Sequence, residues 1–252
     1  MRIQYCSDLH LEFIANNRFL KVNPLKVAAP ILIIAGDLMP FGEMQKHADF
    51  LSWVSDNFAQ TFWIPGNHEY YHNNISNRSG IVDEAIHPNV LLINNISVEL
   101  ENVKILFTSL WSHISPVYEV QIKRSLNDFH VISYNNERFT SYEYNALHDQ
   151  SLSFLEKEME SRNMLKTIIV THHVPTMENY PEEYRNSSIN QAFCVPMDNF
   201  ILRTEPDYWI YGHHHRNIQD FMIGKTQMLT NQLGYVAHNE NSGFSREKVI
   251  QL

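Results

Sequence analysis

Residues 210–217 read IYGHHHRN, three consecutive histidines after a glycine, at the close of a run that has the pattern of a buried strand. Histidine is a common metal ligand, but a lone polar cluster at a strand end is more often a turn. The chemistry of this stretch therefore depends on what the ends of the other strands carry.

Short apolar runs predict further strands, most of them apolar throughout and so buried on both faces. The predicted strands are IQYC (3–6), ILIIA (31–35), FWI (62–64), VLLI (90–93), KILFTSL (104–110), TIIV (167–170) and YWIY (208–211). Between them, Met44, Ala48, Leu51 and Phe58 share one helical face. A second helix is predicted to open at Thr140, because Glu143 three residues later completes a capping box. The alternation of strands and helices indicates an α/β fold.

Polar side chains of ligand type follow five of these strands. They are Asp8 and His10, Asp37, Asn67 with His68 and Glu69, His172 with His173, and His213 with His215. Any one of these pairs alone would be a weak signal, since polar residues at strand ends usually form turns and a buried histidine pair can belong to the core. Five together favour a site, because α/β sheets bind ligands at the carboxyl ends of their strands.

The spacing within the motifs predicts which side chains face the site. If the strands stay extended, residues two apart point to the same side, so Asp8 faces inward with His10 and His213 with His215, while His214 points away. Seven candidate ligands exceed the needs of one ion but fit two ions about 3.5–4 Å apart, with Asp37 as the natural bridge. Mixed oxygen and nitrogen donors suit Mn, Fe, Zn, Ni or Co, with Mn or Fe favoured.

Composition limits the remaining function classes. The chain has 252 residues, 44% of them hydrophobic, and is expected to form a single domain over residues 1–252. Its net charge is −9 and its 19 lysines and arginines form no run, which argues against bulk nucleic acid as a partner. Two cysteines, no signal-peptide pattern and no long apolar run predict a reduced, cytoplasmic protein that does not interact with membranes.

The motifs DLH, GD, GNHE, THH and GHHH, in this order, resemble the five sequence blocks of the calcineurin-like metallophosphoesterases. THHVPT, NQAF (190–193) and TNQLGY (230–235) further resemble a bacterial single-domain group of that superfamily. The resemblance implies an α/β fold built as a four-layer α/β/β/α sandwich of two mixed sheets. It also implies a first metal site of Asp8, His10, Asp37 and His215, and a second of Asp37, Asn67, His172 and His213.

The same resemblance implies a reaction. Two ions would lower the pKa of a bridging water and orient in-line attack of the resulting hydroxide on a phosphate ester, while His68 protonates the leaving oxygen. His173 and Glu69 are expected to support the ligands through hydrogen bonds. Further candidates, for residues that line the substrate-binding side of the site, are Trp111, His113, Asn231 and Tyr235. Tyr180 and Tyr184, in the long irregular segment 174–190, are candidates for a lid.

Differences from two other groups of the superfamily limit the class of substrate. Pro65 stands before GNHE and no arginine accompanies GDLMPFG, unlike the protein serine/threonine phosphatases, and Pro40 replaces the tyrosine of purple acid phosphatases. We therefore expect a metal-dependent phosphatase or phosphodiesterase that acts on a small phosphomonoester or phosphodiester. The alternative is a catalytically inactive scaffold of the same fold that binds other proteins. Every candidate ligand position, and position 68, holds the residue type that the active members of the superfamily have there. This favours the enzyme over the inactive scaffold.

Overall fold

The computed structural model describes residues 1–161 and 165–252, and each apolar run of the sequence lies within or across one of its strands. These strands are β1 (Arg2–Cys6), β2 (Ile31–Ala35), β3 (Gln60–Ile64), β5 (Val90–Asn94), β7 (Val103–Phe107), β10 (Lys166–Val170) and β11 (Tyr208–Tyr211). One prediction was too long: KILFTSL leaves the strand after Phe107, and Leu110 adopts a left-handed φ of 49°.

The strands form two six-stranded mixed sheets. The first has the order β14-β1-β2-β3-β5-β4 and the second β12-β13-β11-β10-β7-β6. Four central strands of each sheet are parallel, and the edge strands pair antiparallel with them. The remaining strands are β4 (Val82–His87), β6 (Ile96–Leu100), β12 (Phe221–Ile223), β13 (Thr226–Thr230) and β14 (Val249–Gln251). The parallel strands of each sheet therefore end at one edge.

The two sheets pack face to face through an apolar core. Ile3, Ile33 and Phe62 of the first sheet meet Phe107 and Val170 of the second, and all five side chains are buried. The rings of Phe62 and Phe107 lie 5.0 Å apart between centroids. Because both faces of the central strands are covered, these strands have apolar runs rather than alternating patterns.

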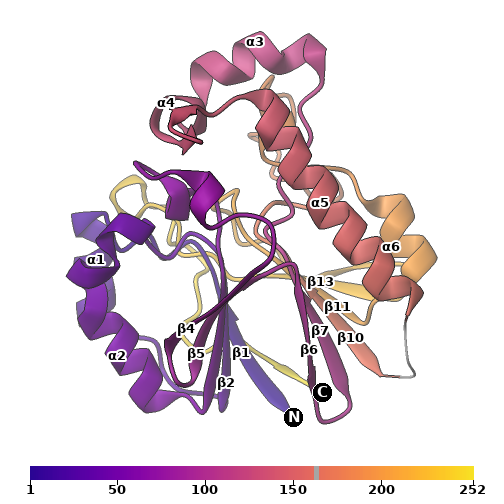
Figure 1. Cartoon of the computed structure of the whole chain (residues 1–252). Helices are drawn as coiled ribbons and strands as arrows, with labels where there is room; N and C mark the ends of the chain where they lie inside the picture. Colours follow the sequence, from indigo (N-terminus) through magenta and orange to yellow (C-terminus); the bar gives the residue numbers. More distant parts are fainter. Residues whose placement is uncertain (162–164) are drawn as a thin grey trace.

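Helices cover the outer faces, as Figure 1 shows. The first sheet packs on α1 (Ile14–Val22) and α2 (Ala48–Asn57), and the second on α5 (Ser141–Glu160) and α6 (Asp198–Thr204). The predicted four-layer α/β/β/α sandwich of two mixed sheets is thus confirmed.

The two predicted helices were right in place but differ in detail. Thr140 caps α5, and its side chain and that of Glu143 form the expected capping box. The segment from Met44 to Phe58 is not one helix, since a 3₁₀ helix, η1 (Phe41–His47), precedes α2, and Phe58 lies just after the end of α2.

A small layer stands above the edge where the parallel strands end. We call it the cap: α3 (Pro116–Ser125), α4 (Asp128–Val131) and the hairpin of β8 (Ser133–Tyr134) and β9 (Glu137–Arg138). Figure 1 shows α3 and α4 above both sheets. Ile122, Leu126 and Phe129 anchor the cap against Tyr144 of α5 and Trp111. Short 3₁₀ helices at this end of the molecule are η2 (His68–Tyr70), η3 (Ile75–Asn77), η4 (Asn190–Ala192) and η5 (Val236–His238).

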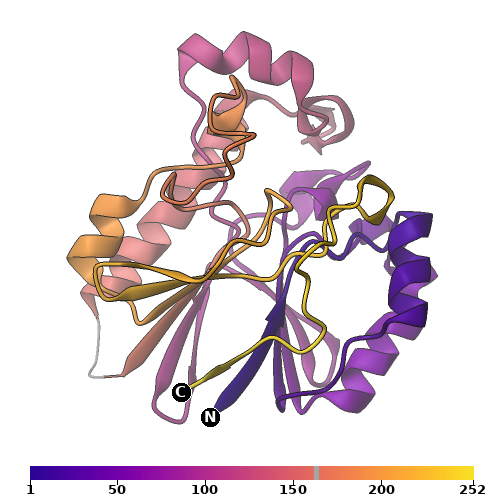
Figure 2. The ribbon, with the colours of Figure 1, turned by 180° about the vertical axis from the view of Figure 1, so that it is seen from behind.

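The C-terminal segment links the two sheets. After β13 in the second sheet, the chain crosses to the first, where β14 pairs with β1, so both termini lie close together (Figure 2). None of the helices in the described part of the chain combines the length and apolar character that a membrane span requires.

Candidate metal centre

The residues predicted to bind metal meet at the carboxyl ends of five strands. Asp8 follows β1, Asp37 follows β2, Asn67 follows β3, His172 follows β10, and His213 follows β11. All of these side chains are buried, with no more than 5% of any of the five residues exposed. A cluster of buried polar side chains of this size needs compensation by hydrogen bonds, charges or bound ions.

The segments that carry the candidate ligands are turns. The prediction from the sequence assumed that these segments are extended strands, and that assumption was wrong. β1 ends at Cys6 and β11 at Tyr211, before the motifs begin. Asp8, His10, His213 and His215 have left-handed φ angles of 56°, 47°, 80° and 54°. Such angles are uncommon outside glycine, and at functional sites they hold side chains that an extended strand would point elsewhere.

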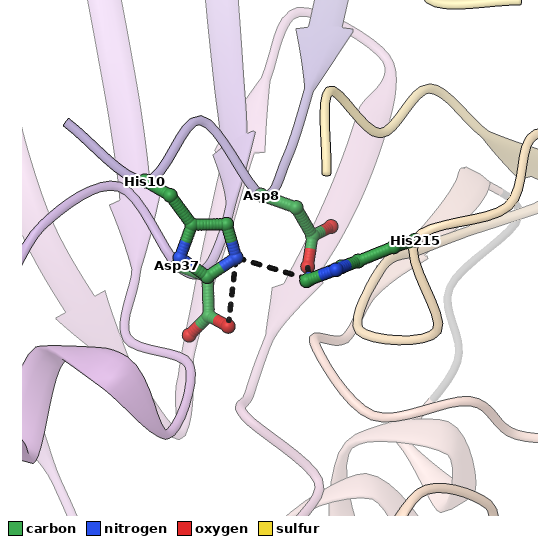
Figure 3. Close-up of side chains that lie close together, drawn as sticks. All are labelled: Asp8, His10, Asp37 and His215. Atoms are coloured by element: carbon green, nitrogen blue, oxygen red, sulfur yellow. Dashed lines mark hydrogen bonds and ion pairs between the residues drawn. The ribbon is translucent and has the colours of Figure 1, made fainter. Parts of the chain in front are cut away.

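Four side chains from three segments form the first group (Figure 3). Asp8, His10, Asp37 and His215 each offer one ligand atom, and these atoms all lie within 4.8 Å of one another. His10 Nε2 is 3.0 Å from His215 Nε2 and 3.6 Å from Asp37 Oδ2. His215 Nε2 is 3.4 Å from Asp8 Oδ1.

A second group shares Asp37 with the first. Ligand atoms of Asp37, His172 and His213 also lie within 4.8 Å of one another. His172 Nε2 lies 3.4 Å from Asp37 Oδ2, 3.0 Å from His213 Nδ1 and 3.3 Å from Asn67 Oδ1. The Asn67 amide nitrogen donates to Asp128 Oδ1 at 2.9 Å, which turns its oxygen toward the group.

Each of the four histidines has an acceptor at its outer ring nitrogen. Carbonyl oxygens of Ala35 and Ala192 lie 3.0 Å from His172 Nδ1 and 3.4 Å from His213 Nε2. Carboxylates serve the other two: Glu12 lies 3.1 Å from His10 Nδ1, and Glu240 lies 2.7 Å from His215 Nδ1. In a neutral ring the proton then sits on the outer nitrogen, and the inner nitrogen presents a lone pair.

These tautomers test whether the residues fit metal ions. The inner nitrogens of His10 and His215 face each other at 3.0 Å, as do those of His172 and His213. Two lone pairs at that distance repel, whereas a cation near both nitrogens stabilises them. The donor set of neutral imidazoles, carboxylates and one amide oxygen therefore fits transition-metal ions.

Two glycines keep the centre open. A Cβ on Gly66 would lie 2.7 Å from His172 Nε2 and would overlap with Asp37 Oδ1. A Cβ on Gly212 would lie 2.5 Å from Asp8 Oδ2. Contacts this short do not occur, so GNH and GHHH each need glycine because the backbone passes close to the ligand atoms.

The surrounding groups keep Asp37 ionised. Burial alone would raise the pKa of its carboxyl, but without bound ions the positive charges of protonated His172 and His68 outweigh burial and lower the pKa well below its ordinary value. Glu69 behaves oppositely: burial, together with the charge of Asp37, raises its pKa to about 8. Glu69 accepts hydrogen bonds from the backbone nitrogens of Asp37 and Gly66, at 3.0 and 2.7 Å. Glu69 thereby links the GD motif to the GNHE motif through hydrogen bonds.

His68 lies beside the two groups. Its Nδ1 is 2.9 Å from Glu12 Oε1, and its Nε2 is 3.1 Å from the hydroxyl of Tyr235. The ring stacks on Tyr71 with 4.0 Å between centroids. Its backbone nitrogen donates to Asp37 Oδ1 at 2.9 Å. Side chain and backbone of His68 thus have separate partners.

The residues predicted to support the ligands or to line the substrate side have different surroundings. His173 is buried between Ser109 and Tyr144, with Nδ1 3.3 Å from the Ser109 carbonyl and Nε2 3.2 Å from the Tyr144 hydroxyl. Tyr235 lines a cavity beside the ligands and makes an edge contact with the His215 ring.

The other three candidates for the substrate-binding side, Trp111, His113 and Asn231, do not line that cavity. Trp111 packs in the apolar cluster under the cap, and its ring lies 5.0 Å from Tyr144. His113 is exposed and faces His148. Asn231 donates to the carbonyls of Tyr5 and Ser245, so its amide joins backbone segments. A strand-end position alone did not distinguish these roles.

Sequence reasoning missed several partners of the ligands. Glu12 contacts both His10 and His68, Glu240 contacts His215, and Asp128 contacts Asn67. Glu12 had a detectable signal, because it follows DLH at the same two-residue spacing. Glu240 and Asp128 had none, since they come from loops far away in the sequence.

The three histidines of GHHH are expected to respond differently to alanine. His214 is buried outside both groups, and its Nδ1 accepts from Gln232 Nε2 at 2.9 Å. His213→Ala and His215→Ala should weaken ion binding by more than the roughly 10–100-fold that loss of an outer hydrogen-bond partner of a ligand causes. His214→Ala should retain the ions and lower the free energy of unfolding by about 1–3 kcal/mol, because Gln232 loses a buried partner.

Metal content by emission spectrometry and urea unfolding would measure these two effects. Loss of ions in the 214 variant alone would move the ligand register by one residue.

Comparisons with known proteins identify the family of this chain. The sequence matches the family of calcineurin-like phosphoesterases over residues 1–217. It is 32% identical to uncharacterized protein L509 of Acanthamoeba polyphaga mimivirus, over 96% of this chain and 94% of that protein. The crystal structure of phosphopantetheinyl hydrolase from Mycobacterium tuberculosis has the same fold, with a TM-score of 0.71 at 16% identity, covering 99% of this chain and 95% of that one. This chain therefore belongs to the calcineurin-like phosphoesterase family.

Proposed function

We propose that this protein is a dinuclear metal-dependent phosphoesterase that hydrolyses a small phosphomonoester or phosphodiester. The observation that carries the proposal is the pair of ligand groups that share Asp37, each with inner histidine nitrogens facing one another. Asp8, His10, Asp37 and His215 would hold one ion, and Asp37, Asn67, His172 and His213 the other.

Two ions held in this way would supply an activated water for in-line attack and neutralise the phosphoryl oxygens. The protein's own part is to position them. Asp37 would contribute a carboxylate between the groups, since its Oδ2 lies 3.6 Å from His10 Nε2 and 3.4 Å from His172 Nε2. We favour Mn or Fe among the candidate metals, because carboxylate oxygens suit Mn and imidazole nitrogens suit Fe.

His68 would donate the proton to the departing oxygen. Glu12 accepts from Nδ1, which orients the ring and leaves Nε2 directed toward Tyr235 and the cavity. A carboxylate on one ring nitrogen stabilises the protonated ring, as a general acid requires before it acts. We assign Glu12 as a positioning residue.

The cavity beside the ligand groups has a volume of about 330 Å³, which suits a small molecule. Tyr180 and Tyr184 of the predicted lid segment line it, together with Leu126 and Asn127 of the cap. The substrate would bind between the cap and the metal centre.

Metal analysis of purified protein, followed by hydrolysis of bis-p-nitrophenyl phosphate and p-nitrophenyl phosphate with added Mn²⁺, tests the proposal. We expect two ions per chain and metal-dependent release of p-nitrophenol. Protein that binds no ions and hydrolyses neither ester would instead favour the inactive scaffold.

A further inference from the structure

The cavity beside the ligand groups, here called the proximal cavity, is lined mainly by aromatic and polar side chains and by no lysine or arginine of the described residues. Tyr180, Tyr184 and Phe193 form much of its wall. Arg216 lies behind this wall, with its guanidinium 5.4 Å from the Tyr184 ring centroid. It donates to Glu183 at 2.8 Å and to the His215 carbonyl at 3.3 Å. Its guanidinium is thus already engaged.

A second cavity opens on the other side of His68. This distal cavity has a volume of about 560 Å³ and also has no lysine or arginine in its lining among the described residues. The two cavities share His68, Tyr71, Asn127 and Tyr235. Both cavities therefore border His68, and the proximal cavity also borders Asp37, His213 and His215.

The number of terminal oxygens decides which kind of phosphate ester fits. A phosphomonoester has three terminal oxygens, and none of the described lysines or arginines lines either cavity to bind the third. A phosphodiester has two, and carries a second organic group where the third oxygen would be.

We infer that the substrate is a phosphodiester whose two organic groups occupy the proximal and distal cavities, and not a phosphomonoester; this rests on the proposed function. Water provides the oxygen of the new P–O bond; of its two protons, one replaces the proton that His68 donates and the other is released to solvent. The P–O bond to one organic group breaks, its electron pair stays on the departing oxygen, and His68 protonates that oxygen. The products are an alcohol and a phosphomonoester.

Equilibrium binding of two compounds that cannot be hydrolysed tests the inference. Dibenzylphosphinate is a monoanion with two arms, and benzylphosphonate at pH 8 is a dianion with one. Calorimetry on Mn²⁺-loaded protein should show at least about tenfold tighter binding of dibenzylphosphinate, a difference of about 1.4 kcal/mol. Equal or tighter binding of benzylphosphonate would overturn the inference.

Two pairs of variants separate the effects of charge and shape. Asn127 is exposed and borders both cavities, so Asn127→Lys should tighten benzylphosphonate binding about tenfold while Asn127→Gln leaves it unchanged.

Ala237 is exposed and lines only the distal cavity of the two. Ala237→Trp should weaken dibenzylphosphinate binding to the level of benzylphosphonate, and Ala237→Ser should not. If Ala237→Trp weakens both ligands equally or neither, the two-cavity placement is wrong.

Hydrolysis distinguishes failure of this inference from failure of the proposed function. Metal-dependent activity with a higher kcat/KM for p-nitrophenyl phosphate than for bis-p-nitrophenyl phosphate would overturn the phosphodiester inference alone. Protein without bound ions and without activity on either ester would overturn both.

Discussion

Asp37→Asn is expected to lose both ions and the hydrolytic activity that depends on them. Asp37 is the one residue that belongs to both ligand groups, and its Oδ2 lies 3.6 and 3.4 Å from the inner nitrogens of His10 and His172. A neutral amide would leave two dications about 4 Å apart with no negative charge between them. Ion affinity should fall by more than the roughly 10–100-fold that loss of an outer hydrogen-bond partner causes.

Metal content per chain and the hydrolysis rate of bis-p-nitrophenyl phosphate measure this effect. Asp56→Asn is a matched control, since Asp56 is exposed on α2 and should retain wild-type ion content. If Asp37→Asn keeps two ions and a near-normal rate, Asp37 does not bridge the ions.

His68→Ala is expected to keep both ions but to slow hydrolysis of esters with alkoxide leaving groups by roughly 10²–10⁴-fold. The backbone nitrogen of residue 68, which donates to Asp37, remains in the variant, so the ligand geometry should persist. The lost ring is the group that Glu12 and Tyr235 hold beside the cavity. His113→Ala is the control, because His113 is exposed and absent from the lining of both cavities.

A series of esters that spans leaving-group pKa separates proton donation from a structural role. The rate of the variant should fall more steeply as the leaving-group pKa rises, because p-nitrophenolate needs little protonation and an alkoxide needs much. Parallel slopes together with reduced metal content would make His68 a ligand or a support. His173 is a poor substitute donor, because it is fully buried between Ser109 and Tyr144.

Sequence pattern predicted the centre of the fold better than its edges. The central strands have continuous apolar runs because both of their faces are buried, and the runs ILIIA and YWIY match β2 and β11. The edge strands β4 and β6 were not predicted, since half-exposed positions interrupt their apolar pattern. Their place in the fold depends on pairing with β5 and β7, which no local pattern shows.

The clustering of the candidate ligands was predictable from the sequence where one motif follows one strand. Contacts made by loops from distant parts of the chain were not predictable. Parallel strands place Asp8 and Asp37 at one edge of the first sheet and His172 at one edge of the second, and the packing of the two sheets brings these edges together. Glu240 reaches His215 from a loop after β13, and no spacing in the sequence indicates that contact. Backbone turns with positive φ, rather than strand alternation, direct the side chains of GHHH.

Anomalous X-ray diffraction from crystals of the Mn²⁺-loaded protein would locate the ions themselves. We expect two anomalous peaks about 3.5–4 Å apart, with a carboxylate oxygen of Asp37 within coordinating distance of both. One peak should lie beside His10 and His215 and the other beside His172 and His213. A single peak, or two peaks of which Asp37 contacts at most one, would contradict a dinuclear centre bridged by Asp37.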